Sequence, residues 1–373
     1  MDGCGDWFAV LKARMSPGEN AAGSEPDLAL ARTGPPERIA VVVNGNAKNV
    51  TAEVISTLDQ ILLGGDLFVS RSLGEADEIA KVVISRGYGT VLTGGGDGTF
   101  SVMVTKVYAE AARQGAPLPR FGFLKLGTGN ALAHVVGASG SGRGALAADI
   151  RRLRQDAGSR EVGLVEVDGE LAPFCGFGVD AVVLQDYEAL KKKLGGTPLE
   201  ALGAGPLGYA LSSLTRSLPR AMVRGPGYCR IINRGAPCFR VGPKGVVSGQ
   251  PLEAGEVLFE GPARLVGVAT IPYYGYGLRA FPFAEDRPDR MHLRISNLSV
   301  PAFIRHFRGI WRGEYQPPRE LSDFLVQRIE VHLEPALPFQ MGGDFRCETS
   351  EKTVSLAPRR IRLVDFYAPP SAS

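Results

Sequence analysis

A glycine-rich stretch around one carboxylate, VLTGGGDGTF at residues 91–100, is the first part of the sequence that could do chemistry. Its central residues are Gly95, Gly96, Asp97, Gly98 and Thr99. Glycines between a strand and a helix let backbone N–H groups approach a phosphate, and the helix dipole favours an anion there. A carboxylate in such a loop would repel phosphate, so we expect Asp97 to orient a metal ion or water, or to pair with a lysine. A tight turn with a capping aspartate is the simpler alternative.

A second glycine loop follows about 30 residues later, in FLKLGTGNALAHVVG. Its residues are Gly127, Thr128, Gly129 and Asn130. Two such loops at neighbouring strand ends would present two sets of backbone donors, which suits a triphosphate. Neither loop has the Gly-Lys-Ser/Thr of a Walker motif, and the first does not fit the dinucleotide fingerprint.

Apolar runs alternate with amphipathic stretches in the first part of the chain. The runs RIAVVV (38–43), LFVS (67–70), TVLT (90–93) and FGFLK (121–125) predict buried strands. Between the first two, helical spacing puts an apolar face on Val54, Ile55, Leu58, Ile61 and Leu62. Alternating strands and helices predict a parallel sheet covered on both faces, which binds ligands beyond the carboxyl ends of its strands.

The pattern changes near residue 161, where short β-branched segments are separated by Gly and Pro. We expect an α/β fold with a Rossmann-like parallel-sheet nucleotide domain at residues 38–160 and an antiparallel β-sandwich domain at residues 161–366. The last strands can return to the first domain. Helical insertions are expected near residues 182–194 and 301–312, and residues 1–37 are expected to form a flexible tail.

The composition is that of a soluble globular protein, with 373 residues, of which 44% are hydrophobic and 22% charged. A formal net charge of +3 is too small to indicate nucleic-acid binding. The five cysteines show no CxxC spacing, so we expect reduced thiols in a cytoplasmic protein. No stretch approaches the roughly 20 apolar residues of a spanning helix.

GGGDGT followed by LGTGN resembles the catalytic domain of diacylglycerol kinases and related lipid kinases, which include sphingosine and ceramide kinases. The resemblance covers most of residues 38–366 and implies a fold similar to NAD kinase and diacylglycerol kinase. It also implies ATP and Mg²⁺ as cofactors and transfer of the γ-phosphate to a hydroxyl of a lipid, such as diacylglycerol or a sphingoid or ceramide-like lipid. The β-rich domain would then hold the lipid acceptor at a membrane surface, at the inner face. A homodimer is compatible with this resemblance.

The same resemblance places further nucleotide contacts in NGNAKN, where the family has Asn-Pro-x-x-Gly. These residues are Asn44, Gly45, Asn46, Ala47 and Lys48. Ser70 stands where the family usually has a Thr. The late Asp-Gly-Glu of bacterial lipid kinases aligns with Gly342, Gly343 and Asp344 in FQMGGDFRCE, which makes Asp344 the candidate base, one methylene shorter than the family Glu.

Two further sites come from the resemblance alone. In CGFGVDAVV, Asp180 would lie toward the acceptor lipid. In AEDRPDRMHL, a structural or regulatory Mg²⁺ would be bound by Asp289, with the carbonyls of Asp286 and Met291 as further ligands. Here Arg290 replaces the family Gly.

Three alternatives stay open at this stage. An NAD kinase shares the GGDGT loop but not the LGTGN form of the second loop. A nucleotide or lipid sensor would keep the loops and lack an effective base. The helix expected in AFIRHFRGIWRG (302–313) is either an interfacial membrane anchor or a helix packed on the β domain.

Overall fold

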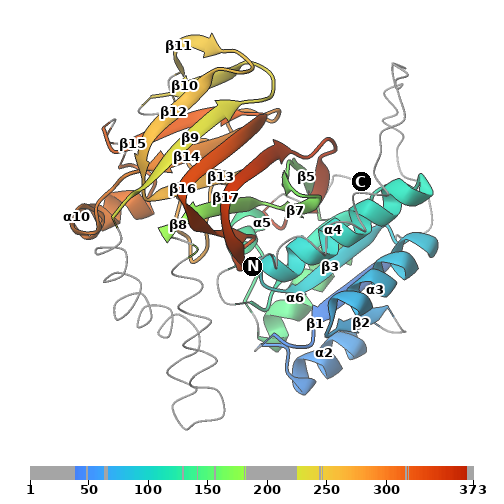
Figure 1. The fold of residues 1–373 in the computed structure, drawn as a ribbon. Helices are drawn as coiled ribbons and strands as arrows, with labels where there is room; N and C mark the ends of the chain where they lie inside the picture. Colours follow the sequence, from blue (N-terminus) through green and yellow to red (C-terminus); the bar gives the residue numbers. More distant parts are fainter. Residues whose placement is uncertain are drawn as a thin grey trace.

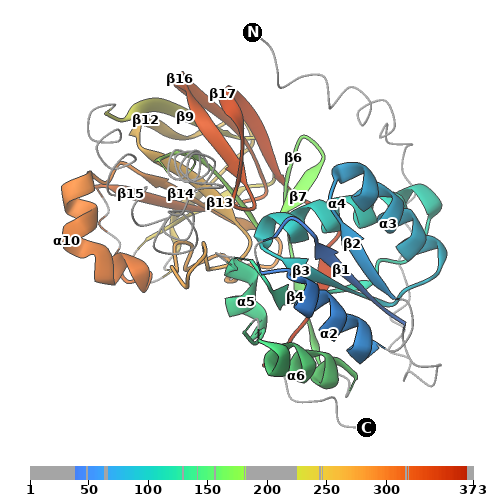
Figure 2. The same cartoon turned by 90° about the horizontal axis from the view of Figure 1, so that it is seen from below.

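The computed structural model describes residues 38–367 except 48, 63–65, 128–129, 141, 155–156, 180, 182–224, 243–244, 246, 316 and 318. The expected tail (1–37) and the expected insertion near 182–194 lie outside the described residues. Figures 1 and 2 show an α/β layer beside a larger β layer, as the sequence predicts.

Six strands form the sheet of the α/β layer, in the order β2-β1-β3-β4-β18-β5. They are β1 (Ile39–Asn44), β2 (Leu67–Ser70), β3 (Thr90–Gly95), β4 (Arg120–Lys125), β5 (Ser159–Val162) and β18 (Ile361–Val364). Strands β1 to β4 are parallel, and β18 pairs parallel with β4 and antiparallel with β5. Thus β18, from the end of the described chain, completes the first sheet.

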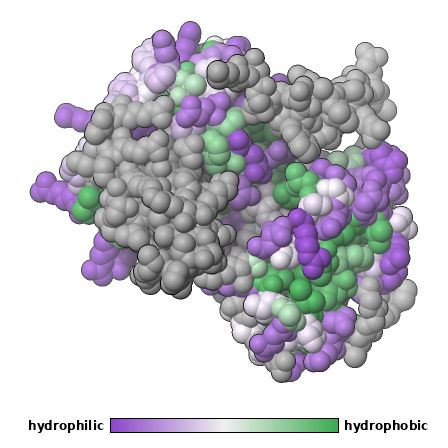
Figure 3. Space-filling view, turned by 60° about the horizontal axis from the view of Figure 1, so that its bottom comes forward, coloured by the Kyte–Doolittle hydropathy of each residue, from purple (hydrophilic) through white to green (hydrophobic). Residues whose placement is uncertain are grey.

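Helices cover both faces of this sheet (Figure 2). Helices α3 (Leu73–Ser85) and α4 (Asp97–Gln114) lie on one face, while α2 (Ala52–Leu62) and α6 (Arg143–Arg154) lie on the other. The short α5 (Ala131–Val136) follows β4. Because both faces are covered, the central strands are mostly buried, and β3 is buried along its whole length, as far as Gly95. Hydrophobic side chains also gather on the visible surface of this layer, at the lower right of Figure 3.

The second sheet is antiparallel and has 12 strands. Its order is β11-β10-β15-β14-β13-β8-β16-β17-β6-β7, with β9 joined to β16 and β12 joined to β9. The strands are β6 (Val165–Val167), β7 (Glu170–Ala172), β8 (Phe174–Gly178), β9 (Gly227–Asn233), β10 (Cys238–Val241), β11 (Val247–Leu252), β12 (Val257–Ala263), β13 (Leu265–Ala269), β14 (Met291–Ser296), β15 (Leu321–Val326), β16 (Arg328–Met341) and β17 (Asp344–Leu356).

Strand β16 is where the antiparallel sheet divides. Its first half pairs with β9, and its last three residues pair with β8. Side chains from both branches share one core, which includes Phe177, Ile231 and Phe324. The two branches therefore enclose a common interior, as a sandwich does.

One helix, α10 (Val300–Trp311), follows β14 and confirms the second predicted insertion. Ser299 caps it by accepting the N–H of Ala302. Among the described residues, no helix is long and apolar enough to cross a membrane.

Candidate active site

The first glycine loop lies where β3 ends and α4 begins. Gly96 is the N-cap of α4 and offers no side chain to its first turn. A Cβ on Gly95 would overlap the Thr99 side chain, and a Cβ on Gly94 would lie 2.7 Å from Val43 Cγ1. Close packing therefore leaves no room for a side chain at Gly94 or Gly95. The N–H groups in the first turn of α4 have no partner within the helix, so they can bind an anion.

The two predicted loops are in contact through their backbones. A Cβ on Gly127 would overlap Cα of Gly96. Asn130 adopts a left-handed φ of 48° and is buried. Its side chain accepts the N–H of Gly127 (3.2 Å) and donates to the Gly127 carbonyl (2.6 Å). Asn130 thus bonds back to Gly127 within the second loop, and Gly127 lies directly against Gly96 of the first loop.

Asp97 links the first loop to the helix after the second. Its Oδ2 accepts the N–H of Ala131 at 2.8 Å, and its Oδ1 accepts the N–H of Leu132 at 3.1 Å. The N-cap of α5, Asn130, makes no cap bond of its own, so Asp97 takes over the capping role from 33 residues upstream. The expected contact with a metal ion, a water or a lysine is thus replaced by two backbone donors.

The environment of Asp97 shifts its titration. Burial raises the pKa of Asp97 to about 6, while the two backbone N–H bonds act to lower it and the nearby Asp344 acts to raise it. The carboxylate is therefore mostly ionised at neutral pH and is protonated in mild acid.

The loop after β1 joins this assembly. Asn44 Nδ2 donates to Thr99 Oγ1 at 3.1 Å, and Asn44 Oδ1 accepts the N–H of Asn46 at 2.9 Å. Asn49 Nδ2 reaches the Gly127 carbonyl at 3.5 Å. The amides of this loop therefore connect β1 to both glycine loops.

The remaining predicted nucleotide contacts that the structure describes, Gly45, Ala47 and Ser70, lie in the loop after β1 and at the end of β2. A Cβ on Gly45 would lie 2.9 Å from Val69 Cγ1, and Ala47 donates its N–H to the Asn44 carbonyl at 2.9 Å. Ser70 ends β2, and its hydroxyl donates to the Ser72 carbonyl at 3.1 Å. Among the predicted residues, Lys48, Thr128, Gly129 and Asp180 lie outside the described residues.

Asp344 reaches the first glycine loop from a hairpin of the β domain. Gly342 (φ 59°) and Gly343 (φ 84°) form the two-residue turn between β16 and β17, whose paired ends are Met341 and Asp344. A Cβ on Gly98 would overlap the Asp344 carboxylate. The third predicted motif is thus packed against the first, although 247 residues separate Asp344 from Asp97.

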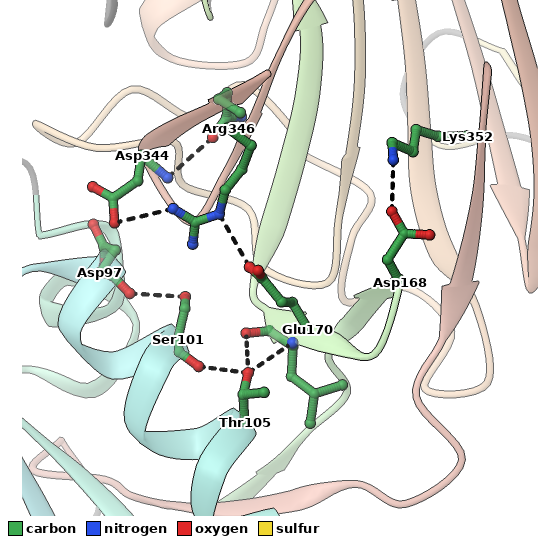
Figure 4. Close-up of polar contacts among 11 residues, drawn as sticks. Asp97, Ser101, Thr105, Asp168, Glu170, Asp344, Arg346 and Lys352 are labelled. Atoms are coloured by element: carbon green, nitrogen blue, oxygen red, sulfur yellow. Dashed lines mark hydrogen bonds and ion pairs between the residues drawn. The ribbon is translucent and has the colours of Figure 1, made fainter. Parts of the chain in front are cut away.

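Figure 4 shows two charged residues beside Asp344 that the sequence analysis missed. Arg346 Nη1 lies 3.8 Å from Asp344 Oδ2, and Arg346 Nε donates to Glu170 Oε2 at 3.0 Å. Desolvation raises the pKa of Asp344, Arg346 lowers it, and Glu170 raises it. Arg346 follows Asp344 at the two-residue period of one strand face, which was a usable signal.

Further polar groups fix the hairpin. Gly342 donates its N–H to the Phe174 carbonyl at 3.0 Å. Gly343 donates its N–H to Gln340 Oε1 at 3.0 Å, and Gln340 Nε2 donates to the Tyr274 hydroxyl at 2.6 Å. These bonds hold Asp344 in place from the β domain.

The expected Mg²⁺ site at Asp286, Asp289 and Met291 does not fit a metal ion here. Arg290 Nη1 donates to Asp289 Oδ2 (2.5 Å) and to the Asp289 carbonyl (2.9 Å), and Arg290 Nη2 donates to the Pro237 carbonyl (3.2 Å). Arg287 Nε also lies 3.3 Å from Asp289 Oδ1. Two arginines therefore engage the Asp289 carboxylate that a hard cation would use, and we derive no step through a metal at this place.

The shifted pKa of Asp97 leads to a prediction about stability. Because the folded-state pKa is near 6 and the ordinary value is 3.8, the folded chain binds this proton more tightly than the unfolded chain. The unfolding free energy of the wild type, relative to Asp97→Asn, should fall by roughly 2.5 kcal/mol as pH rises from about 4 to 7. Urea melts across this interval measure it. A difference that rises with pH would mean that the backbone hydrogen bonds outweigh burial.

Replacing Arg290 tests the arginine in the expected metal site. Without nucleotide, the melting temperature of the wild type should be the same in EDTA and in Mg²⁺. Arg290→Gly frees Asp289 and two carbonyls, so that variant should gain a Mg²⁺-dependent rise in melting temperature. Arg287→Gly is the matched control and should gain none. A wild type that melts higher in Mg²⁺ would contradict this assignment.

Comparisons with known proteins agree with this geometry. Residues 38–162 match the family model of the diacylglycerol kinase catalytic domain. The chain is 31% identical over 182 residues to a Xanthomonas oryzae protein named "Probable lipid kinase YegS-like", a match that covers 46% of this chain and 57% of the relative. A Pseudomonas aeruginosa protein of the same name is 34% identical over 146 residues, covering 38% and 41% respectively. The chain thus matches 57% and 41% of the lengths of these two relatives.

The fold also matches solved structures. A crystal structure of a diacylglycerol kinase from Bacillus anthracis superposes with a TM-score of 0.56 at 15% identity, covering 88% of this chain and 97% of that one. This likeness confirms the predicted fold class. Together with the two contacting glycine loops, the family match shows that residues 38–162 are similar to a diacylglycerol kinase catalytic domain.

Proposed function

We propose that the chain is an ATP-dependent lipid kinase, which transfers the γ-phosphate of ATP to a hydroxyl of a lipid such as diacylglycerol or a sphingoid or ceramide-like lipid. The observation that carries the proposal is the packing of Asp344 against Gly98. It brings a carboxylate of the β domain to the N-terminus of α4, where a phosphate would bind.

In this proposal, backbone N–H groups at the start of α4 hold the nucleotide phosphates, and the second loop, which lies against the first, forms the wall beside them. Asn44 and Thr99 form the neighbouring side of the site, held together by their hydrogen bond. Asp97 positions the site without contacting the nucleotide, because its carboxylate fixes α5 against α4.

Asp344 accepts the proton of the lipid hydroxyl in the proposed reaction. As that proton leaves, the hydroxyl oxygen forms a bond to the γ-phosphorus, the bond from phosphorus to the β–γ bridging oxygen breaks, and ADP departs. Arg346 and Glu170 set the charge around Asp344, and its side chain is 45% exposed, which leaves it open to an acceptor.

Mg²⁺ bound with the nucleotide would neutralise charge on its phosphates. Asp97 is a poor direct ligand for it, because both carboxylate oxygens already accept backbone N–H groups. The roles assigned to Asp344 and the loops do not depend on a protein ligand to the ion.

The test is phosphoryl transfer by the full chain. Purified protein is incubated with γ-labelled ATP, Mg²⁺ and mixed lipid vesicles, with NAD as a parallel acceptor. Label in a lipid is the expected result. Label in NADP would instead indicate an NAD kinase, and nucleotide binding with no transfer to any acceptor would indicate a sensor.

Asp344→Asn isolates the proton acceptor. It should lower kcat by about 10²–10⁴-fold, because the amide cannot take the proton, while nucleotide affinity stays within a few-fold of the wild type. Asp59→Asn, an exposed carboxylate on α2, is the matched control and should leave kcat unchanged. An unchanged kcat in Asp344→Asn would remove Asp344 from the reaction.

Gly98→Ala tests the contact between the two domains. The added Cβ overlaps the Asp344 carboxylate, so that side chain must move away from the loop. We expect kcat to fall by about 10²-fold with a smaller change in nucleotide affinity. Gly144→Ala on α6, where a Cβ meets nothing within 4 Å, is the control. Equal activity of both variants would show that the contact is dispensable.

A further inference from the structure

Helix α10 lies at the outer edge of the β layer, far from the α/β layer in both Figure 1 and Figure 2. One of its faces packs on the chain that follows it. The rings of His306 and Tyr315 stack with centroids 4.2 Å apart, and a Cβ on Gly309 would lie 3.3 Å from Tyr315 Cβ. This contact fixes which side of α10 is the inner side.

Large apolar side chains occupy the opposite side of α10. Ile304 is 61% exposed and Phe307 is 45% exposed. Trp311, one turn further, has its ring centroid 5.3 Å from that of Phe307. We call Ile304, Phe307 and Trp311 the outer apolar face. Such a patch on the surface of a folded protein indicates contact with an apolar partner.

Three arginines run along one flank of this face. Arg305, Arg308 and Arg312 are exposed and recur at helical spacing. Within the part of the chain that the structure describes, none of them forms an ion pair with a carboxylate. A surface hollow of about 380 Å³ is lined by Phe307, Arg308, Trp311 and Arg312, so it has both aromatic and cationic walls.

We propose that α10 docks this chain on an anionic lipid surface. The outer apolar face enters the boundary between headgroups and acyl chains, and Arg305, Arg308 and Arg312 lie at the level of the lipid phosphates. A helix of 12 residues is about 18 Å long, so it lies in the surface and does not span it. The choice of a lipid surface rests on the proposed lipid acceptor.

The charges favour a lipid surface over a second copy of the chain. An antiparallel two-fold contact through the outer apolar face would place both rows of arginines on the same side, without acidic side chains on α10 to balance them. Anionic lipid supplies the missing charge, and its acyl chains accept the apolar side chains.

The experiment measures binding of the full chain to phosphatidylcholine vesicles with and without phosphatidylserine. Co-sedimentation gives the partition constant. In a Trp7→Phe background, Trp311 is the remaining tryptophan and its emission reports on α10. We expect binding that requires phosphatidylserine and weakens with salt, together with a blue shift of Trp311 emission.

Two triple variants separate the contributions. Arg305→Ala/Arg308→Ala/Arg312→Ala should weaken partitioning about 100-fold, about 5-fold for each arginine. Ile304→Ser/Phe307→Ser/Trp311→Ser should weaken it by on the order of 100-fold. Leu73→Ser and Arg151→Ala, exposed on α3 and α6, are the matched controls and should bind like the wild type. Thermal melts confirm that each variant folds.

Phosphorylation of a dispersed short-chain diacylglycerol is measured in parallel. This reaction needs no membrane, so it separates the proposed docking from the proposed kinase activity. Loss of vesicle binding with retained short-chain activity supports docking through α10. Unchanged vesicle binding in both triple variants overturns it, whatever the activity. A dimer in sedimentation that disappears in the apolar variant, with vesicle binding unchanged, assigns the face to self-association and also overturns it. Failure on every acceptor with α10-dependent vesicle binding overturns the kinase alone.

Discussion

The two hydrogen bonds from the N–H groups of Ala131 and Leu132 to Asp97 are the constraint on which the site depends. They tie the start of α5 to the start of α4, and so hold the two glycine loops with Gly96 and Gly127 in backbone contact. A carboxylate placed there satisfies buried N–H groups that would otherwise be costly. Because these bonds engage both oxygens of Asp97, we expect the surrounding backbone N–H groups to bind the phosphate.

The β domain supplies the carboxylate of Asp344 to the glycine loops of the α/β layer. The turn at Gly342 and Gly343 needs two left-handed residues, and it turns β17 back so that its first residue, Asp344, meets Gly98. An aspartate is shorter than the family's glutamate, and the bare Cα of Gly98 lets it approach closely. Strand β18 returns to the first sheet, so the chain crosses between the layers on both sides of this hairpin.

The sequence predicted the alternating elements well, because apolar runs such as RIAVVV are buried on both faces and leave a clear pattern. Its motifs also selected the two loops and Asp344, which the structure brings into contact. It could not show that Asp97 bonds α5, because that depends on the approach of two loops 30 residues apart. Glu170 and Gln340 reach the Asp344 hairpin through the register of the sheet, which no local pattern reveals. The bond from Arg290 to Asp289 likewise depends on the position of a guanidinium, which the sequence does not give.

Hydrogen–deuterium exchange with and without ATP can show whether the two loops form one phosphate-binding unit. Peptides covering residues 91–100 and 121–133 report on the loops separately. We expect ATP to slow exchange in both peptides over the same concentration range. Protection of one peptide with no change in the other, at saturating ATP, would contradict it.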